Sequence, residues 1–514
     1  MRNSPRPKNR LLKGLQGFYE ENFLQKKLNT VWGYIFVTAL VLVLAALTAK
    51  DMVVGIGVVA GLCGLLIGIV CISNARLGLY IIMTYSFFAF FISRLLFKGT
   101  LSVGVIFDVL VLTTFIGVLI KDSFKPDLNS FVKNALVVGV LCTLFYSGVQ
   151  FFNPNSNSSE TDWLAFRKFL GYVFIMFIAY NVFSSYASAR NYIRFLFIIC
   201  TITGLYGCIQ QWHGYFDFEM QLIMADPHGF GLIFVNGEFR KYSTMSDPAA
   251  YGILMAVSGV FFLIIASDES KPFNKAVLIL GSILMLLGMA YSGTRTAYAT
   301  AVAGMAFYIL LNFDKKSTRL FGLVAGMVLL VMLYGPFYGN KTVDRIRSTF
   351  VGAEDESYKV RVLARAFIQP YIRSHPMGGG LGTTGGMGAL AQPGHYLANF
   401  QPDSSYLKRA AETGWIGLAI ICIIYYIALY TGIRGFFRVK DSNIKIIYAA
   451  SVTSLFAFYI AEYAQVALGQ ITDSVVYYPI LAMILRLKYF DSTATSNTLE
   501  NPLPETILSE QGSA

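Results

Sequence analysis

Long apolar runs constrain the fold of this chain more than any other feature. About fourteen runs are each close to the ~20 residues that an α-helix needs to cross ~30 Å of hydrocarbon. They lack the two-residue alternation and short length of β-barrel strands, which favours helices. The sequence therefore predicts an all-α polytopic membrane protein with about 12–14 transmembrane helices. The runs cover residues 31–49, 53–72, 77–97, 101–120, 133–152, 166–183, 192–211, 249–266, 276–291, 296–313, 319–336, 412–431, 446–466 and 470–486.

The basic residues predict how the helices are oriented. Lys and Arg in short loops stay on the cytoplasmic side, and alternating the loops from a cytoplasmic N-terminus places most of the 41 Lys and Arg residues inside. The net charge of +12 therefore marks topology, and basic residues scattered over membrane loops do not indicate a nucleic-acid partner. Both termini are expected in the cytoplasm, and the long passage 337–411 outside.

These features divide the chain into five regions. We predict a cytoplasmic amphipathic segment, a transmembrane bundle with an outside loop at 212–248, a long outside loop, a second group of membrane helices and a disordered cytoplasmic tail. Their bounds are 1–30, 31–336, 337–411, 412–490 and 491–514.

Neither the cysteines nor the histidines indicate a metal site. All six Cys residues lie in apolar segments without CxxC spacing, so they predict no disulfide framework and no zinc site. His213 and His228 in the outside loop lack the spacing of metal ligands. In the same loop, the Asn-Gly pair at 236–237 predicts the turn of a short hairpin.

A polar stretch at 357–417 is the strongest candidate for chemistry. It begins with a predicted helix from Ser357 to Arg373, on which Arg361 and Arg365 share one face. A different, apolar face comprises Val360, Leu363, Ala364, Phe367, Ile368 and Tyr371.

The rest of this polar stretch leaves two alternatives open. The glycine-rich segment 375–386 allows either a flexible tether or a loop of special backbone conformation. Further on, Asp403 or Ser404 is placed to cap a helix whose first turn is expected at the outer surface.

Three cations near the outer surface need an explanation. Arg295 lies in AYSGTRTAYA (290–299), where an ionisable residue indicates either an anion site or a structural ion pair. Arg167 and Lys168 begin an apolar run at its outer end, which is unfavourable unless an anion lies nearby or the side chains extend to lipid phosphates.

At this point the sequence resembles the O-antigen ligase and polymerase superfamily of bacterial inner-membrane glycosyltransferases. YSGTRTAYA resembles the family's small-Ser-x-Arg helix start, and YKVRVLARAFIQPYIRSHPMGGGLGT resembles its Arg-bearing loop helix followed by Pro and G-x-G. DSSYLKRAAETGWIGL resembles H-N-x-Y-L…E-x-G-x-x-G, and STMSDPAAYG (243–252) resembles a block that opens a family helix. The blocks span roughly 240–420 in the family's order.

The resemblance implies a GT-C-like bundle in the bacterial inner membrane, with its active site on the periplasmic side under a partly helical loop. It also implies a polyprenyl-pyrophosphate-linked glycan donor, an acceptor that is a glycan, lipid or protein, and contact with membrane lipid, without a cofactor or a metal. Asp403 is the expected catalytic base, with His395 as the alternative, and Arg295 and Arg361 would stabilise the leaving group. The expected pyrophosphate-binding residues are Arg295, Arg361, Arg365, Arg167, Lys168 and Arg240.

One departure from the family pattern bears on the reaction. Ligases of this family usually have His where this chain has Asp403, whereas polymerase-like members tolerate Asp, so a repeat-unit polymerase is favoured. A ligase to lipid A core and a protein O-oligosaccharyltransferase remain alternatives, which differ only in the acceptor. A lipid-linked glycan flippase is an alternative of another class, although the sequence lacks the internal repeats typical of transporters.

Overall fold

The computed structural model describes most of the apolar runs. It covers residues 30–31, 33–35, 38–39, 52–120, 130–156, 158–235, 237–336, 339, 341–351 and 356–491. The predicted N-terminal segment 1–30, the first apolar run at 31–49 and the tail 491–514 therefore lie outside the described residues, apart from these few positions.

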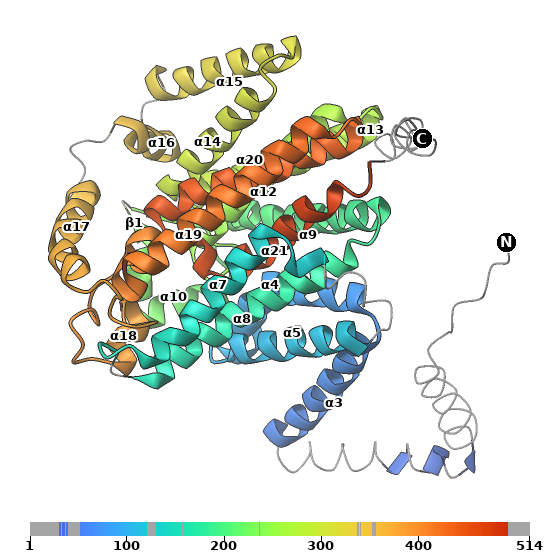
Figure 1. Cartoon of the computed structure of the whole chain (residues 1–514), viewed down its shortest axis with the longest axis vertical. Helices are drawn as coiled ribbons and strands as arrows, with labels where there is room; N and C mark the ends of the chain where they lie inside the picture. The colour runs from blue at the N-terminus through green and yellow to red at the C-terminus, as the bar shows by residue number, and fades with distance from the viewer. Residues whose placement is uncertain are drawn as a thin grey trace, which may run out of the picture.

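The described part of the chain is helical, as predicted, with a single two-stranded hairpin (Figure 1). Among the described residues, ten helices are long and apolar enough to cross a membrane, namely α4, α5, α7 with η3, α8, α9, α12, α13, α15, α19 and α20. The helices are α3 (Met52–Ser73), α4 (Ala75–Phe97), α5 (Val103–Ile120), α7 (Ala135–Val149), η3 (Gln150–Phe152), α8 (Ser159–Val182), α9 (Tyr186–His213), α10 (Asp217–Ala225), α11 (Pro227–Ile233), α12 (Pro248–Asp268), α13 (Pro272–Tyr291), α14 (Arg295–Leu311), α15 (Lys316–Tyr334), α16 (Lys341–Val351), α17 (Glu356–Ser374), α18 (Gly385–Ala391), α19 (Ser405–Arg438), α20 (Ser442–Ala464), η4 (Ala467–Gly469) and α21 (Ile471–Leu487).

Local sequence explains where several helices begin. The carboxylate of Asp247 accepts hydrogen bonds from two backbone N–H groups of α12, and Pro248 follows at the first helical position, where its missing N–H costs nothing. Asn74 caps α4 and Asp441 caps α20 in the same way. These side chains satisfy amide groups that helix formation leaves without an internal partner.

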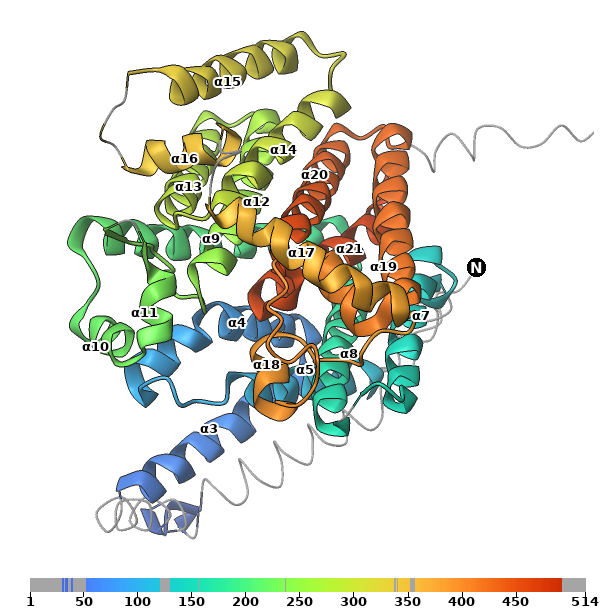
Figure 2. The ribbon, with the colours of Figure 1, turned by 90° about the vertical axis from the view of Figure 1, so that its left-hand side faces the viewer.

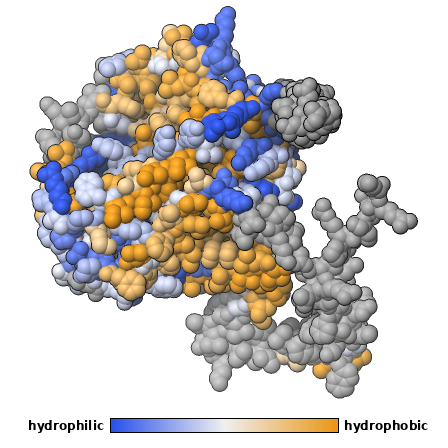
Figure 3. Space-filling view, viewed as in Figure 1, coloured by the Kyte–Doolittle hydropathy of each residue, from blue (hydrophilic) through white to orange (hydrophobic). Residues whose placement is uncertain are grey.

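The core is formed by α12, α20 and α21. In the most apolar stretch of each helix, 83% of the residues of α12 and 78% of those of α20 are buried. The corresponding share is 6% in α15, which lies at the edge of the bundle (Figure 1). All residues of α21 from Thr472 to Leu487 are buried. Around this core, Figure 3 shows a broad exposed apolar belt, with hydrophilic residues gathered towards the ends of the helices. Such a belt suits contact with lipid.

The polar passage 337–411 contains the predicted helix and two further ones. The helix expected from Ser357 to Arg373 is α17, and α16 and α18 are additional. Figure 2 shows α17 lying over the bundle beside α19. From residue 361 onwards, the buried side chains of α17 are Ile368 and Ile372, which belong to one cluster with Leu397 and Phe400. The predicted apolar face was partly wrong, because Leu363 and Phe367 are 68% and 55% exposed.

The hairpin predicted within residues 212–248 is confirmed. Strand β1 (Phe234–Val235) pairs antiparallel with β2 (Glu238–Phe239), with Phe234 opposite Phe239. Gly237 has a φ of +78°, which a two-residue turn requires and glycine adopts without strain.

Candidate active site

The turn between α13 and α14 is the centre of a candidate site. Thr294 donates its hydroxyl hydrogen to the carbonyl oxygen of Pro248, over 2.8 Å. A Cβ atom added to Gly252 would overlap the side chain of Ser292, so α12 packs directly against the turn. The sequence blocks 243–252 and 290–299 are therefore assembled face to face.

Two arginines from other elements hold this turn. The Nε of Arg240 donates to the carbonyl oxygen of Ser292 at 3.1 Å, and its Nη2 donates to the hydroxyl of Thr294 at 2.8 Å. Arg345, on α16, donates from Nε to the carbonyl oxygen of Gly293. Gly293 has a φ of +59°, and a Cβ atom there would lie 3.2 Å from Arg345 Nε. Glycine thus permits both the backbone conformation and the approach of the guanidinium groups.

Arg295 and Arg361 extend this group of charges. Arg295, the first residue of α14, lies close enough to Arg345 and Arg361 for their charges to interact. We call Arg240, Arg295, Arg345 and Arg361 the arginine cluster. Burial and the neighbouring Arg345 lower the pKa of Arg240 to about 10, so its guanidinium remains charged at neutral pH. Several cations gathered in a partly buried place favour the binding of an anion.

Asp403 joins the arginine cluster through Arg361. Its Oδ2 lies 3.7 Å from Arg361 Nε, and the side chains are 45% and 30% exposed. Helix α19 begins after it, with Ser404 as the N-cap residue and no side-chain capping bond. The structure thus provides no capping role for Asp403, and its carboxylate faces the loop helix instead.

His395 is placed differently from Asp403. Its Nδ1 accepts a hydrogen bond from the backbone N–H of Leu397 at 3.1 Å, and its Nε2 lies 3.0 Å from the carbonyl oxygen of Asn155. Since the Nδ1 acts as an acceptor, Nε2 carries the proton and donates it. Both ring nitrogens are therefore engaged with backbone, which favours a structural role over that of a base.

Two of the other predicted cations have their own partners. Arg167 pairs with Asp108 of α5 at 2.7 Å, which supplies the anion expected near it. Arg365 donates to the hydroxyl of Tyr463 at 3.0 Å, and its guanidinium lies 4.8 Å from the centre of that ring. Arg365 thus docks α17 on α20, whereas Arg361 on the same face reaches Asp403.

The glycine-rich segment 375–386 is a packed loop. The N–H groups of Gly379 and Gly380 donate to the carbonyl oxygens of Ala411 and Glu412, at 2.8 and 2.9 Å. Helix α19 is interrupted there, because Gly414 has a φ of +67°. A Cβ atom at Gly414 would overlap the carbonyl of Pro376. Of the two alternatives left by the sequence, these contacts favour the loop of special backbone conformation.

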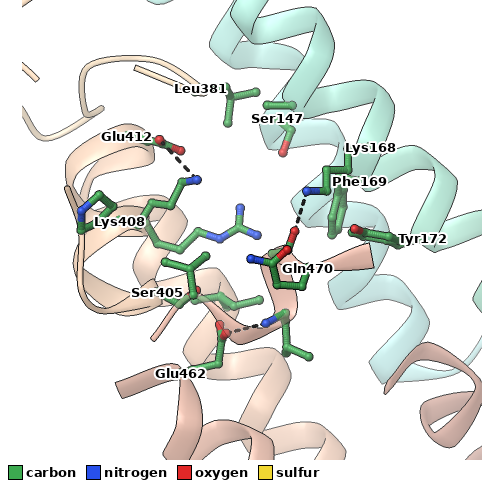
Figure 4. A pocket seen from close by; sticks show the side chains of 18 of the residues that line it. Ser147, Lys168, Phe169, Tyr172, Leu381, Ser405, Lys408, Glu412, Glu462 and Gln470 are labelled. Carbon is green, nitrogen blue, oxygen red and sulfur yellow. Dashed lines mark hydrogen bonds and ion pairs between the residues drawn. The ribbon is translucent and has the colours of Figure 1, made fainter. Parts of the chain in front are cut away.

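Under this loop lies a cavity of about 390 Å³ that contains Lys168. Its charged lining residues are Lys168 of α8, Lys408, Arg409 and Glu412 of α19, and Glu462 of α20 (Figure 4). Lys168 donates from Nζ to the carbonyl oxygen of Gly469. We call this cavity the α8–α19 pocket.

The described residues offer no evident metal centre. Nowhere among them are three or more His, Cys, Asp or Glu side chains grouped as ligands for an ion.

The comparisons with known proteins bear on the part of the chain that holds this site. Residues 280–422 match the family model described as O-antigen ligase. These residues are thus similar to the O-antigen ligase family. The match confirms the resemblance and supports a glycosyltransferase activity of the O-antigen ligase or polymerase type. No curated protein matches the chain.

The matched segment 280–422 holds some of the predicted site residues and several that were missed. Arg295, Arg361, Arg365, His395 and Asp403 lie within it, whereas Arg167, Lys168 and Arg240 precede it. Sequence reasoning overlooked Arg345, Lys408 and Arg409, which the fold brings to the arginine cluster and to the α8–α19 pocket. A signal existed for Arg409, because it lies less than two helical turns after Asp403.

Proposed function

We propose that this protein transfers an oligosaccharide from polyprenyl pyrophosphate to an acceptor hydroxyl at the outer face of the inner membrane, as a repeat-unit polymerase. The observation that carries the proposal is that Arg361 lies between the other two residues: its Nε is 3.7 Å from Asp403 Oδ2, and its charge interacts with that of Arg295, which follows the turn between α13 and α14. These residues come from separate blocks of the family domain and supply the two functions that the reaction needs.

The chemistry follows from the charges. The acceptor oxygen attacks the anomeric carbon of the donor sugar, and the bond from that carbon to the pyrophosphate oxygen breaks. The leaving pyrophosphate takes the electron pair, and the arginine cluster stabilises its negative charge. Asp403 accepts the proton of the attacking hydroxyl. The proposed mechanism does not require a metal ion.

The position of the site supports its assignment to the outer face. Asp403, Arg345 and Arg361 all belong to the long passage from 337 to 411, which the distribution of Lys and Arg elsewhere in the chain predicts to lie outside. Helices α16 and α17 of this passage bring their arginines to the end of the membrane helices. The donor lipid would thus remain in the outer leaflet while its pyrophosphate enters the arginine cluster.

A transfer assay with purified protein tests the proposal. Arg295→Ala and Arg361→Ala should each lower transfer from the lipid carrier by about 100-fold or more, since an oxyanion-stabilising group contributes on that order. Arg373→Ala, at the exposed end of α17, is a matched control that should keep the parent rate. Parent rates in both cluster variants would refute the mechanism.

The glycans of a deletion strain decide between polymerase and ligase. Loss of long chains, with single repeat units retained, is the expected result for a polymerase. Accumulation of free lipid-linked polymer would show a ligase instead. Transfer of the glycan to a protein would identify an O-oligosaccharyltransferase, which shares the same donor chemistry.

A further inference from the structure

The α8–α19 pocket is separate from the arginine cluster. None of the four arginines in the cluster lines the pocket. The lining comes instead from α7, α8, α19, α20, α21 and the glycine-rich loop. The protein thus has two distinct cationic regions beside the same outer loop.

The charges of the pocket are only partly neutralised by its own residues. Lys168 is held by a neutral carbonyl oxygen. Lys408 lies 3.8 Å from Glu412, whose carboxylate also accepts a hydrogen bond from the hydroxyl of Thr384. Arg409 interacts electrostatically with a carboxylate of α20, but in the described part of the chain its guanidinium makes no hydrogen bond.

The second carboxylate, Glu462, is occupied by the protein itself. It accepts a hydrogen bond of 2.7 Å from the backbone N–H of Leu468 and one of 3.2 Å from the hydroxyl of Tyr425. In addition, Ser405 lines the pocket as the first residue of α19, whose first turn has no side-chain cap. The positive end of the helix dipole therefore adds to the field of the three cations.

The pocket is amphiphilic. Its charged residues lie beside the glycine-rich loop, whereas the part between the membrane helices is lined by Val140, Phe169, Ile421, Ile424 and Leu481. A volume of about 390 Å³ accommodates a phosphate group with the beginning of a lipid or a sugar, but not a whole glycan chain. An anionic head joined to an apolar chain is the ligand that matches this lining.

The pocket and the arginine cluster share one wall. Gln401, Pro402 and Ser405 line the pocket, and between them Asp403 directs its carboxylate to Arg361. A ligand held in the pocket would therefore lie next to the segment that carries the proposed base. Transfer needs a second substrate in such a position, because the hydroxyl to be deprotonated belongs to the acceptor.

We infer that the α8–α19 pocket binds the phosphate-bearing head of the acceptor glycolipid, while the arginine cluster binds the pyrophosphate of the donor. The inference rests on the proposed function and adds a second phosphate site to it. Lys168 and Arg409 bind the acceptor phosphate, and Lys408 contributes charge. The acceptor is a lipid-linked pyrophosphoryl saccharide in a polymerase and a phosphorylated core glycolipid in a ligase, which share this chemistry.

Binding of inorganic pyrophosphate tests the pocket without any transfer. Isothermal titration of the full-length protein in detergent should show two sites. Lys168→Gln with Arg409→Gln should remove one of them, and Arg295→Gln the other. Arg409→Lys keeps the charge and should keep both, and the melting temperature of each variant shows whether it is folded. A single site in the parent, or two in the double variant, would overturn the inference.

Kinetics with distinguishable substrates tests the assignment to the acceptor. The acceptor carries a non-cleavable phosphonate in place of its sugar–phosphate oxygen, so that it cannot act as a donor. Arg409→Gln should raise the KM for the acceptor by about tenfold or more and leave that of the donor within about twofold, since one charge-assisted contact is lost. A rise confined to the donor KM would refute the assignment.

The outcomes separate the inference from the proposed function. Two pyrophosphate sites without any glycan transfer would refute the glycosyltransferase proposal and leave the pocket as an anion site. Transfer with a single pyrophosphate site would refute the pocket and leave the proposed function intact. Running the assay with a lipid-linked saccharide and with a phosphorylated core glycolipid shows which source of phosphate the pocket accepts.

Discussion

Replacement of Asp403 by Asn should abolish transfer while leaving the protein folded. The side chains of Asp403 and Arg361 are 45% and 30% exposed and 3.7 Å apart. An ion pair this exposed contributes only about 0.2–1 kcal/mol to stability. Loss of a general base costs about 10²–10⁴ in rate, which is roughly 3–5 kcal/mol of activation free energy. The predicted effect on catalysis therefore exceeds the effect on folding severalfold.

The assay follows labelled glycan from the lipid carrier to the acceptor, and the melting temperature is measured on the same preparation. Asp403→His introduces the residue usual in ligases of the family and should retain measurable transfer, since imidazole can also accept the proton. Arg373→Gln serves as the control for a charge removed from α17. Asp403→Asn with a rate within about threefold of the parent would show that this carboxylate is not the base, because such a loss is far below that expected for general-base catalysis.

Three further predictions follow from the backbone and from the chemistry. Gly293→Ala should reduce both transfer and stability, because its Cβ would meet Arg345. Gly99 has a φ of +82° in open space, so Gly99→Ala should cost only the backbone strain of about 1 kcal/mol. Equal loss of transfer in both variants would contradict this prediction. Gly414→Ala should displace the glycine-rich loop, since its Cβ would overlap the Pro376 carbonyl. The free energy of unfolding should fall by about 2–4 kcal/mol, which is seen as a lower melting temperature. A parent-like melting curve would refute that contact. Transfer should continue at the parent rate after exhaustive treatment with EDTA, and loss that added Mg²⁺ restores would disprove the metal-independent mechanism.

The site could be predicted in part because its sequence blocks are local. YSGTRTAYA places Arg295 at the start of a helix, and the spacing of Arg361 and Arg365 places both on one face of α17. The roles of these two arginines diverge in the structure, because one meets Asp403 and the other Tyr463. Spacing along a helix specifies which way a side chain points, but not which partner the fold brings to it.

The cations at the start of α8 show the same limit. Arg167 and Lys168 are adjacent, and both were expected to bind pyrophosphate. Neighbouring residues on a helix point about 100° apart, so Arg167 faces Asp108 of α5 while Lys168 enters the α8–α19 pocket. The sequence could indicate that these cations need an anion nearby. It could not indicate that the protein itself provides a carboxylate, Asp108, for Arg167 and a backbone carbonyl for Lys168.

The sequence by itself determined the all-helical membrane class and the place of most described helices, because the length of an apolar run and the residues that cap it are local properties matched to the thickness of a bilayer. Only the tertiary structure decided that Arg240, Arg345 and Gly293 converge, and that the glycine-rich loop covers a cationic pocket. These contacts join residues far apart in the chain. They depend on how the helices pack against one another, which no local pattern specifies.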